Sequence, residues 1–304
     1  MPPDTSLTVT DLMTFQHTLT YGFLSLALVA LWLPPKETKK NPLRLWQILY
    51  VAALGCGVLF GHVQFFGLPP IIVLGISCYC TGSEQYTKTV RIIAGTIMLA
   101  LSVALSLHVV PGFSNPKIIS NMIISQGGIP YSKYLNFDKS LVGLFVLGFS
   151  CKNLPSKPQA WKRMFRQAAP ISGITIFVLL FMSLALGYVQ FEPKWSAFFW
   201  FWAWSNLLFT CIAEEAVYRS IIQRYLIAGL MKYRFGAIAG LVLAAVLFGL
   251  MHYSGGAKYM LLSTVAGLGY GWTYLRTQRI EASILTHFLL NCIHFVFFTY
   301  PALA

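Results

Sequence analysis

Apolar runs of about 20 residues recur along this chain of 304 residues, separated by short polar segments that carry most of its Lys and Arg. About 20 apolar residues are needed for a helix to cross the hydrocarbon core of a bilayer, where only helices and closed barrels satisfy every backbone hydrogen bond. Apolar residues make up 57% of the chain. The sequence therefore predicts an all-α, polytopic integral membrane protein that has the lipid bilayer as a partner.

We expect about ten membrane-spanning helices, and at least about eight, because the runs at 68–81 and 140–151 are short for a bilayer. The longest polar stretch, 111–139, is rich in Pro and Gly, and we expect it to be a solvated loop. The alternatives are a cover over the mouth of a cavity or a segment that dips into the membrane interface. The expected spans are about 14–33, 46–66, 68–81, 92–110, 140–151, 169–191, 195–230, 235–251, 257–275 and 282–300.

Positive charge is divided unevenly between the two sides of this expected bundle. Alternating ten spans from an outside N-terminus places 17 of the 22 Lys and Arg in cytoplasmic loops and helix ends. The other side then holds Lys117, Lys133, Lys139, Lys194 and Lys258. This asymmetry follows the positive-inside rule and predicts both termini on the non-cytoplasmic side of a plasma membrane, the inner membrane in a bacterium. It also explains the net charge of +13 without nucleic-acid binding.

Three charged residues, Glu214, Glu215 and Arg219, lie inside the apolar run 195–230. A charge at the centre of a membrane helix costs roughly 2.5–3.5 kcal/mol, so such residues mark functional sites. Glu215 and Arg219 are four residues apart with the acid first, which favours an ion pair on a helix. We expect these two residues to pair and Glu214 to remain a carboxylate without a partner, suited to moving protons.

Polar residues on two other expected helices can reach the same depth. Glu214 lies 20 residues before Arg234 and His252 lies 18 after it, so both sit roughly 27–30 Å from one turn along antiparallel helices. His287 and Asn291 are four residues apart on the last expected span and face the same way. The sequence predicts a site of one carboxylate, two histidines and one asparagine.

Three motifs in order resemble the CAAX-protease and bacteriocin-processing family, the Rce1-like glutamic intramembrane endopeptidases. They are Glu214-Glu215-x-x-x-Arg219, Phe248-x-x-x-His252 and His287-x-x-x-Asn291. The flanking segments LAAVLFGLMHY and GLGYGWTYLRTQRIEASILTHFLLN are also similar to family sequence. The resemblance covers about residues 195–298, and Ser220 departs from the glycine that often follows the arginine in the family.

The resemblance implies a metal-independent endopeptidase that uses no cofactor. Glu214, helped by His252, would activate a water to attack a peptide carbonyl, and His287 and Asn291 would stabilise the oxyanion. The substrate would be a membrane-anchored or hydrophobic peptide segment. Three residues would have supporting roles: Glu215, Arg219 and Phe248.

The same resemblance divides the chain into two parts. Residues 191–304, with the last four expected helices, would form the catalytic core. Residues 1–190 would form N-terminal transmembrane helices of unassigned role. The sequence makes no prediction about the oligomeric state.

Other interpretations of the polar residues remain open. A catalytically silent membrane scaffold or transporter would keep them as a network that binds helices together. Two histidines and a glutamate could also bind zinc in a membrane peptidase, although no HExxH motif is present and His252 and His287 lie 35 residues apart. The glycines at 267, 269 and 271 favour close helix packing over phosphate binding.

Overall fold

The computed structural model describes residues 13–33, 44–151 and 158–304. Helical structure overlaps every expected span within these ranges. The predicted stop at Pro34–Pro35 and five of the counted basic residues (Lys36, Lys39, Lys40, Lys152, Lys157) lie outside the described residues. The longer helices are α2 (Phe15–Ala30), α3 (Leu45–Leu59), α4 (Leu68–Gly82), α5 (Lys88–Ser106), α6 (Phe137–Phe145), α7 (Pro158–Ala185), α8 (Phe199–Asn206), α11 (Gly236–Leu250), α12 (Gly256–Thr277) and α13 (Ile280–Phe297).

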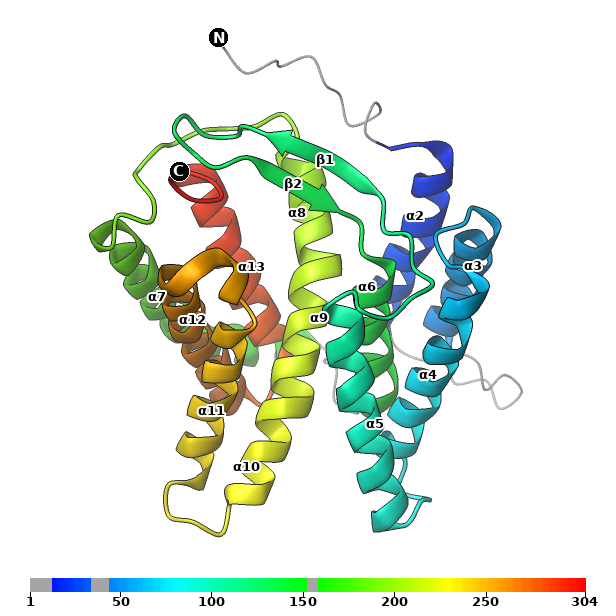
Figure 1. Cartoon of the computed structure of the whole chain (residues 1–304). Coiled ribbons are helices and arrows are strands. Elements are labelled where there is room, and N and C mark those ends of the chain that lie inside the picture. Colours follow the sequence, from blue (N-terminus) through cyan, green and yellow to red (C-terminus); the bar gives the residue numbers. More distant parts are fainter. Residues whose placement is uncertain (1–12, 34–43, 152–157) are drawn as a thin grey trace.

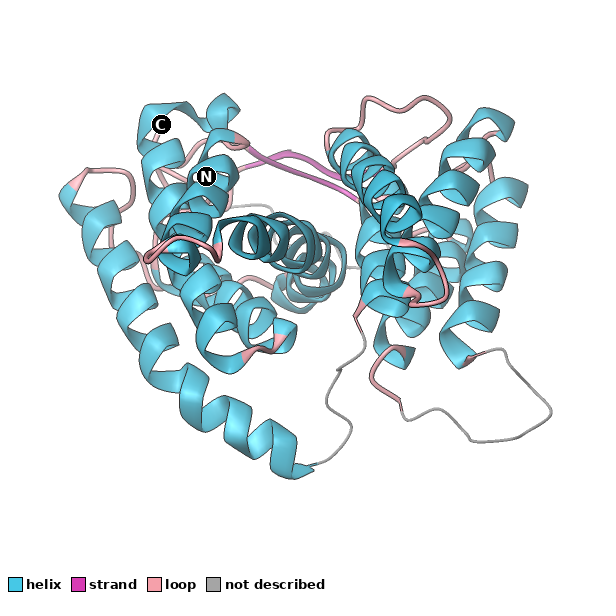
Figure 2. Ribbon diagram, turned by 90° about the horizontal axis from the view of Figure 1, so that it is seen from below, coloured by secondary structure: helices cyan, strands magenta, loops and turns pink. Residues whose placement is uncertain are grey.

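A central rod runs from Phe199 to Leu230 between two groups of helices (Figures 1 and 2). On one side of it lie α2 to α6, and on the other α7 and α11 to α13. Helix α6 packs against the rod segments η3 (Leu207–Cys211) and α9 (Ile212–Glu215). Helix α11 packs against the rod segment η4 (Ala216–Gln223), and α13 packs against α9. The rod is therefore covered on both sides at the level of its two glutamates. The last segment of the rod, after η4, is α10 (Arg224–Leu230).

Part of the expected loop 111–139 is an antiparallel β-hairpin, so the prediction of a solvated loop is wrong there. Its strands are β1 (Lys117–Met122) and β2 (Tyr131–Tyr134), paired through Lys117–Tyr134 and Met122–Tyr131. Ile118 and Ile119 are buried, which anchors β1 against the helices. The hairpin crosses one end of the molecule, and α6 begins three residues after β2 (Figure 1).

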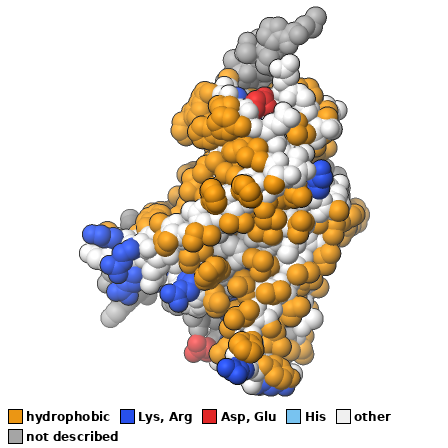
Figure 3. Space-filling model, turned by 90° about the vertical axis from the view of Figure 1, so that its left-hand side faces the viewer, with side chains coloured by type: hydrophobic (Ala, Val, Ile, Leu, Met, Phe, Trp, Pro, Cys, Tyr) orange, Lys and Arg blue, Asp and Glu red, His pale blue; other side chains and the backbone are white. Residues whose placement is uncertain are grey.

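The described ranges contain four helices long and apolar enough to cross a membrane, or five if the bent pair of α11 and the segment Tyr253–Thr277 is one span. Apolar side chains cover most of the face in Figure 3, and its Lys and Arg gather mainly toward the lower end. The prediction of a multi-pass membrane protein is confirmed at this level, whereas about ten spans stays a prediction. The four helices are Phe65–Gly82 (η1, Phe65–Gly67, with α4), α5, α7 and α13.

The ends of the helices alternate as the expected topology requires. The start of α2, the hairpin and the C-terminus lie at one end of the molecule (Figure 1). The loop between α4 and α5 and the turn between α10 and α11 lie at the opposite end (Figure 1).

Helix α7 begins at Pro158, whereas the sequence places the start of this span near Ala169. The added turns are amphipathic: Met164 and Ala168 are buried while the basic side chains around them are exposed. A proline at a helix start costs nothing, because its missing N–H would have no partner there. The sequence prediction, which counted apolar residues only, therefore missed the basic amphipathic beginning of the helix.

The three glycines of α12 lie where other helices approach closely. A Cβ at Gly267 would lie 3.0 Å from Ala245 Cα in α11, and one at Gly269 would lie 2.2 Å from Thr175 Cγ2 in α7. At Gly271 it would lie 2.5 Å from Gln223 Oε1 in the rod. The interpretation of these glycines as packing positions is confirmed.

Replacing Gly269 with alanine should destabilise the protein, because the new methyl group overlaps the Thr175 side chain. Overpacking of this kind costs about 1–3 kcal/mol. Gly173→Ala in α7 is the matched control, since a Cβ there meets nothing within 4 Å. Thermal unfolding in detergent should show a lower Tm for Gly269→Ala alone. Equal Tm values for the two variants would contradict the packing role.

Candidate active site

The two adjacent glutamates lie on the rod between two π-helical segments. Glu214 and Glu215 end α9, which follows η3 and precedes η4. A π-helical turn carries an extra residue and often occurs at functional sites. The Glu215 side chain is completely buried, whereas 15% of the Glu214 side chain is exposed. The neighbouring carboxylates therefore occupy different surroundings.

Glu215 is held by two partners at once. Its Oε2 accepts a hydrogen bond from Arg219 Nε at 2.8 Å, which confirms the predicted ion pair. Its Oε1 accepts one from His287 Nδ1 of α13 at 3.0 Å. Arg219 also donates to Gln223 Oε1 at 3.2 Å, and Gln223 donates to the carbonyl of Gly271 in α12 at 2.9 Å. This buried network ties α12 and α13 to the rod.

Glu214 is not the unpaired carboxylate that the sequence predicts. Lys139 Nζ, in the first turn of α6, donates to Glu214 Oε1 at 2.7 Å. A second lysine from the same region, Lys133 of β2, donates to Thr210 Oγ1 at 3.3 Å, one turn before Glu214 on the rod. Among the described residues, Glu214 Oε2 forms no hydrogen bond, so this oxygen can receive a water.

His252 lies just beyond α11, and its tautomer follows from its partner. Nδ1 is 2.7 Å from the carbonyl oxygen of Phe248. A carbonyl only accepts, so Nδ1 carries the proton and Nε2 keeps a lone pair in the neutral ring. The Phe248 ring packs against His252 at a centroid distance of 4.8 Å and against Tyr218 of the rod at 4.9 Å. Phe248 thus sets the position of His252 relative to the rod.

His287 and Asn291 both face the rod, so the prediction that they share one face of their helix is confirmed. His287 binds Glu215, and its ring stacks on Tyr270 of α12 with centroids 4.6 Å apart. Asn291 Nδ2 donates to Asn206 Oδ1 at the end of α8, at 3.1 Å. His287 and His252 both lie close enough to Glu214 to interact with its charge.

Several contacts of this site are absent from the sequence prediction. The Lys139–Glu214 pair joins residues 75 positions apart, and no local pattern connects them. Asn206 offers a usable signal, because it is a polar residue within an apolar run, two turns before Glu214. Tyr270 offers none, since an aromatic residue in an apolar helix is ordinary. No three His, Cys, Asp or Glu side chains in the described ranges are grouped to hold a metal ion.

Residues 193–293 match the family model of the type II CAAX prenyl endopeptidase Rce1-like proteins. This segment is an Rce1-like domain. The match confirms the family that the three motifs indicate, and that family is one of proteases. The domain covers about one third of the chain and contains α8 to α12 and most of α13. No curated protein and no solved structure matches the chain.

Removing one member of the buried ion pair should destabilise the protein strongly. Arg219→Met leaves the Glu215 carboxylate buried without its main counter-ion, which typically costs about 3–5 kcal/mol. The exposed Arg276 at the end of α12 provides the control, and Arg276→Met should cost little. The double variant Glu215→Gln/Arg219→Met should lose less than the sum of the two single changes. Additive losses in thermal unfolding would contradict direct pairing.

The half-buried Lys133 should give the folded protein a measurable pH dependence. Burial, followed by repulsion from Lys139, lowers the pKa of Lys133 from its ordinary 10.5 to about 8. Below about pH 8 the lysine is protonated in both the folded and the unfolded chain. Between about pH 8 and 10.5 only the unfolded chain keeps this proton, so the free energy of unfolding rises with pH across that window.

Thermal unfolding of wild type and Lys133→Met across pH 7–10.5 tests this linkage. Above about pH 8 the Tm of wild type should rise relative to the Tm of the Lys133→Met variant. Lys117→Met, an exposed change in β1, should keep the wild-type pH dependence. Parallel curves for wild type and Lys133→Met would contradict the expectation.

Proposed function

We propose that this protein is a metal-independent, glutamic-type intramembrane endopeptidase that cleaves a membrane-anchored or hydrophobic peptide segment. The observation that carries the proposal is the Rce1-like domain with Glu214 at the centre of its polar cluster. Glu214 has one carboxylate oxygen free among the described residues, and His252 has a ring nitrogen able to accept a proton.

In the proposed reaction Glu214 Oε2 binds a water and takes one of its protons, while the oxygen of the water attacks the carbon of the peptide carbonyl. His252 Nε2 accepts a hydrogen bond from the same water and orients it. The carbonyl oxygen becomes an oxyanion, which His287 Nε2–H, with the ring in its imidazolium form, and the Asn291 amide stabilise. The C–N bond then breaks, and the proton held by Glu214 passes to the departing amine.

Glu215, Arg219 and Phe248 act in this proposal as positioning residues. The Glu215 carboxylate accepts a hydrogen bond from His287 Nδ1. The other ring nitrogen, Nε2, therefore points away from Glu215 and is left for the substrate. Arg219 balances the charge of Glu215 and lies 5.6 Å from the centroid of the Phe248 ring. Lys139 holds the other oxygen of Glu214 and so limits rotation of the carboxylate.

The proposed topology places the turn between α10 and α11 in the cytoplasm and both termini on the opposite side. Support comes from the basic residues Lys232 and Arg234 in that turn and from the positive-inside rule. The hairpin then lies on the non-cytoplasmic side, above the site. Residues 191–304 form the proposed catalytic core, and residues 1–190 the accessory helices.

Replacing Glu214 with glutamine should abolish cleavage in a folded protein, because the amide cannot take the proton from water. Loss of a general base typically lowers the rate about 10²–10⁴-fold. Glu192→Gln provides the control, since it also removes a carboxylate while an amide oxygen can still accept the Gln126 N–H bond. Masses of membrane-anchored tails in a host expressing each variant report the cleavage.

Each possible result of this experiment separates the proposal from its alternatives. Tails left uncut only with Glu214→Gln support glutamate-dependent proteolysis. Identical masses with wild type, Glu214→Gln and empty host, at equal protein levels in the membrane, favour the silent scaffold or transporter. Cleavage by purified wild-type protein that stops with a chelator and returns with zinc would replace the proposal by the zinc peptidase.

A further inference from the structure

A cavity of about 570 Å³ opens between α5 and α10. It lies on the side of the rod that faces α2 to α6, away from the two glutamates. Arg224, in its lining, lies ten residues beyond Glu214, or roughly 15 Å along a helix. Helix α5 packs against η4, and its lower part diverges from α10 (Figure 1). Its lining is Thr81, Lys88, Arg91, Ile92, Gly95, Thr96, Leu99, Arg224 and Tyr225.

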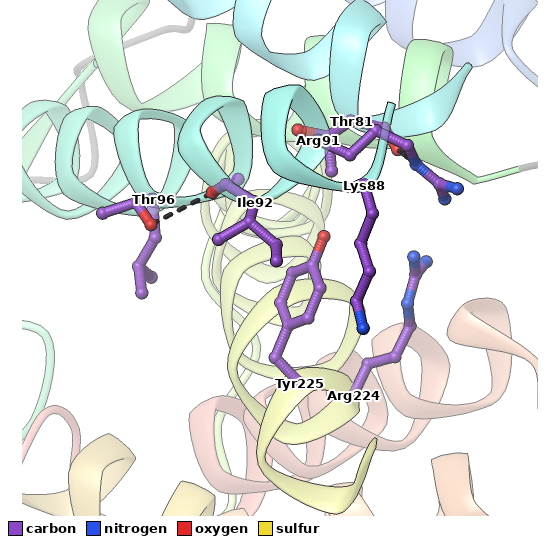
Figure 4. Close-up of a pocket in the computed structure, with 9 residues that line it drawn as sticks. Thr81, Lys88, Arg91, Ile92, Thr96, Arg224 and Tyr225 are labelled. Carbon is purple, nitrogen blue, oxygen red and sulfur yellow. Dashed lines mark hydrogen bonds between the residues drawn. The ribbon is translucent and has the colours of Figure 1, made fainter. Parts of the chain in front are cut away.

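Three cationic side chains meet at one end of this cavity. Lys88 extends from α5 toward α10, and Arg224 extends from α10 toward α5 (Figure 4). Arg91 lies beside them and donates from Nε to the carbonyl of Thr81 at 3.4 Å. Among the described residues none of the three forms an ion pair with a carboxylate. The adjoining cavity, which Arg91 and Arg224 also line, adds one carboxylate, that of Glu84, so positive charge remains in excess.

The helix that carries Lys88 and Arg91 increases this positive potential. Both residues lie in the first turn of α5, which contains no acidic residue. The N-terminus of a helix carries about half a positive charge, so basic residues there are unfavourable unless an anion lies nearby. A bound anion would remove this penalty.

The rest of the cavity is suited to hydrocarbon. Ile92, Leu99 and the Gly95 backbone continue the lining along α5 toward the middle of the bundle, and Ile92 is 58% exposed. The Tyr225 ring forms part of the opposite wall, with its hydroxyl toward α5 (Figure 4). A free phosphate would use only the cationic end, whereas a lipid would fill both ends.

We propose that this cavity binds an anionic phospholipid, with its phosphate among Lys88, Arg91 and Arg224 and an acyl chain along Ile92, Gly95 and Leu99. Basic pockets between membrane helices recognise anionic headgroups, and anionic lipids are enriched in the leaflet that faces the cytoplasm. The site lies at the same end of the bundle as the turn between α10 and α11 (Figure 1). It is independent of peptidase activity.

Equilibrium binding of fluorescent dioleoyl-phosphatidylglycerol to the detergent-solubilised full chain tests the proposal. Unlabelled dioleoyl-phosphatidylglycerol should displace the probe at least about tenfold better than dioleoyl-phosphatidylcholine, since the two lipids differ only in headgroup. Inorganic phosphate should not displace it. Equal displacement by the two lipids would overturn the proposal, and so would displacement by phosphate at the concentrations effective for the anionic lipid.

Three variants locate the site. Lys88→Gln/Arg224→Gln should weaken binding about tenfold or more through lost charged hydrogen bonds. Gly95→Leu should weaken it by filling the apolar end while every charge stays in place, because a Cβ there meets nothing nearer than the Tyr225 hydroxyl at 3.5 Å. Lys232→Gln, in the exposed turn at the same end, should leave affinity unchanged. Equal losses for Lys232→Gln and Lys88→Gln/Arg224→Gln, or full affinity in Gly95→Leu, would overturn the proposal.

Discussion

The buried ion pair between Glu215 and Arg219 is the interaction on which the arrangement of the polar core depends. Both side chains are completely inaccessible to solvent, so each charge requires its partner. The pair extends through His287 into α13 and through Gln223 into α12. Since an unpaired charge at this depth costs several kcal/mol, these helices can pack only where Glu215 and Arg219 stay paired. The network therefore aligns the helices of the Rce1-like domain around the rod.

The adjacent carboxylates have different surroundings because their helix packs against different neighbours on its two sides. Glu215 faces α13, whereas Glu214 meets Lys139 of α6 and keeps one oxygen free of hydrogen bonds among the described residues. A single carboxylate could not do both tasks, charge balance and proton transfer, because a counter-ion must keep its charge whereas a proton acceptor must lose it. Their separation lets Glu215 remain fixed while Glu214 exchanges a proton with water in the proposed reaction.

The segment before the Rce1-like domain contributes to the site that the domain carries. Lys139 from α6 and Lys133 from β2 both contact the rod within two turns at Thr210 and Glu214. Tyr21 of α2 donates to the carbonyl of Leu135 at 2.8 Å, which supports the connection between β2 and α6. Helix α2 thus supports the segment that carries the two lysines, and α5 with the end of α4 forms one wall of the cationic cavity.

The sequence by itself determined the class of fold, the family and the Glu215–Arg219 pair, because apolar run length, motif order and i, i+4 spacing are local properties. It also placed His287 and Asn291 on one face, for the same reason. Only the tertiary structure decided that Glu214 pairs with Lys139, that His287 binds Glu215, and that residues 117–134 include a hairpin. The two side-chain contacts join segments 75 and 72 residues apart, so no local pattern records them. The hairpin is a local structure, but it depends on the burial of Ile118 and Ile119 against the helices.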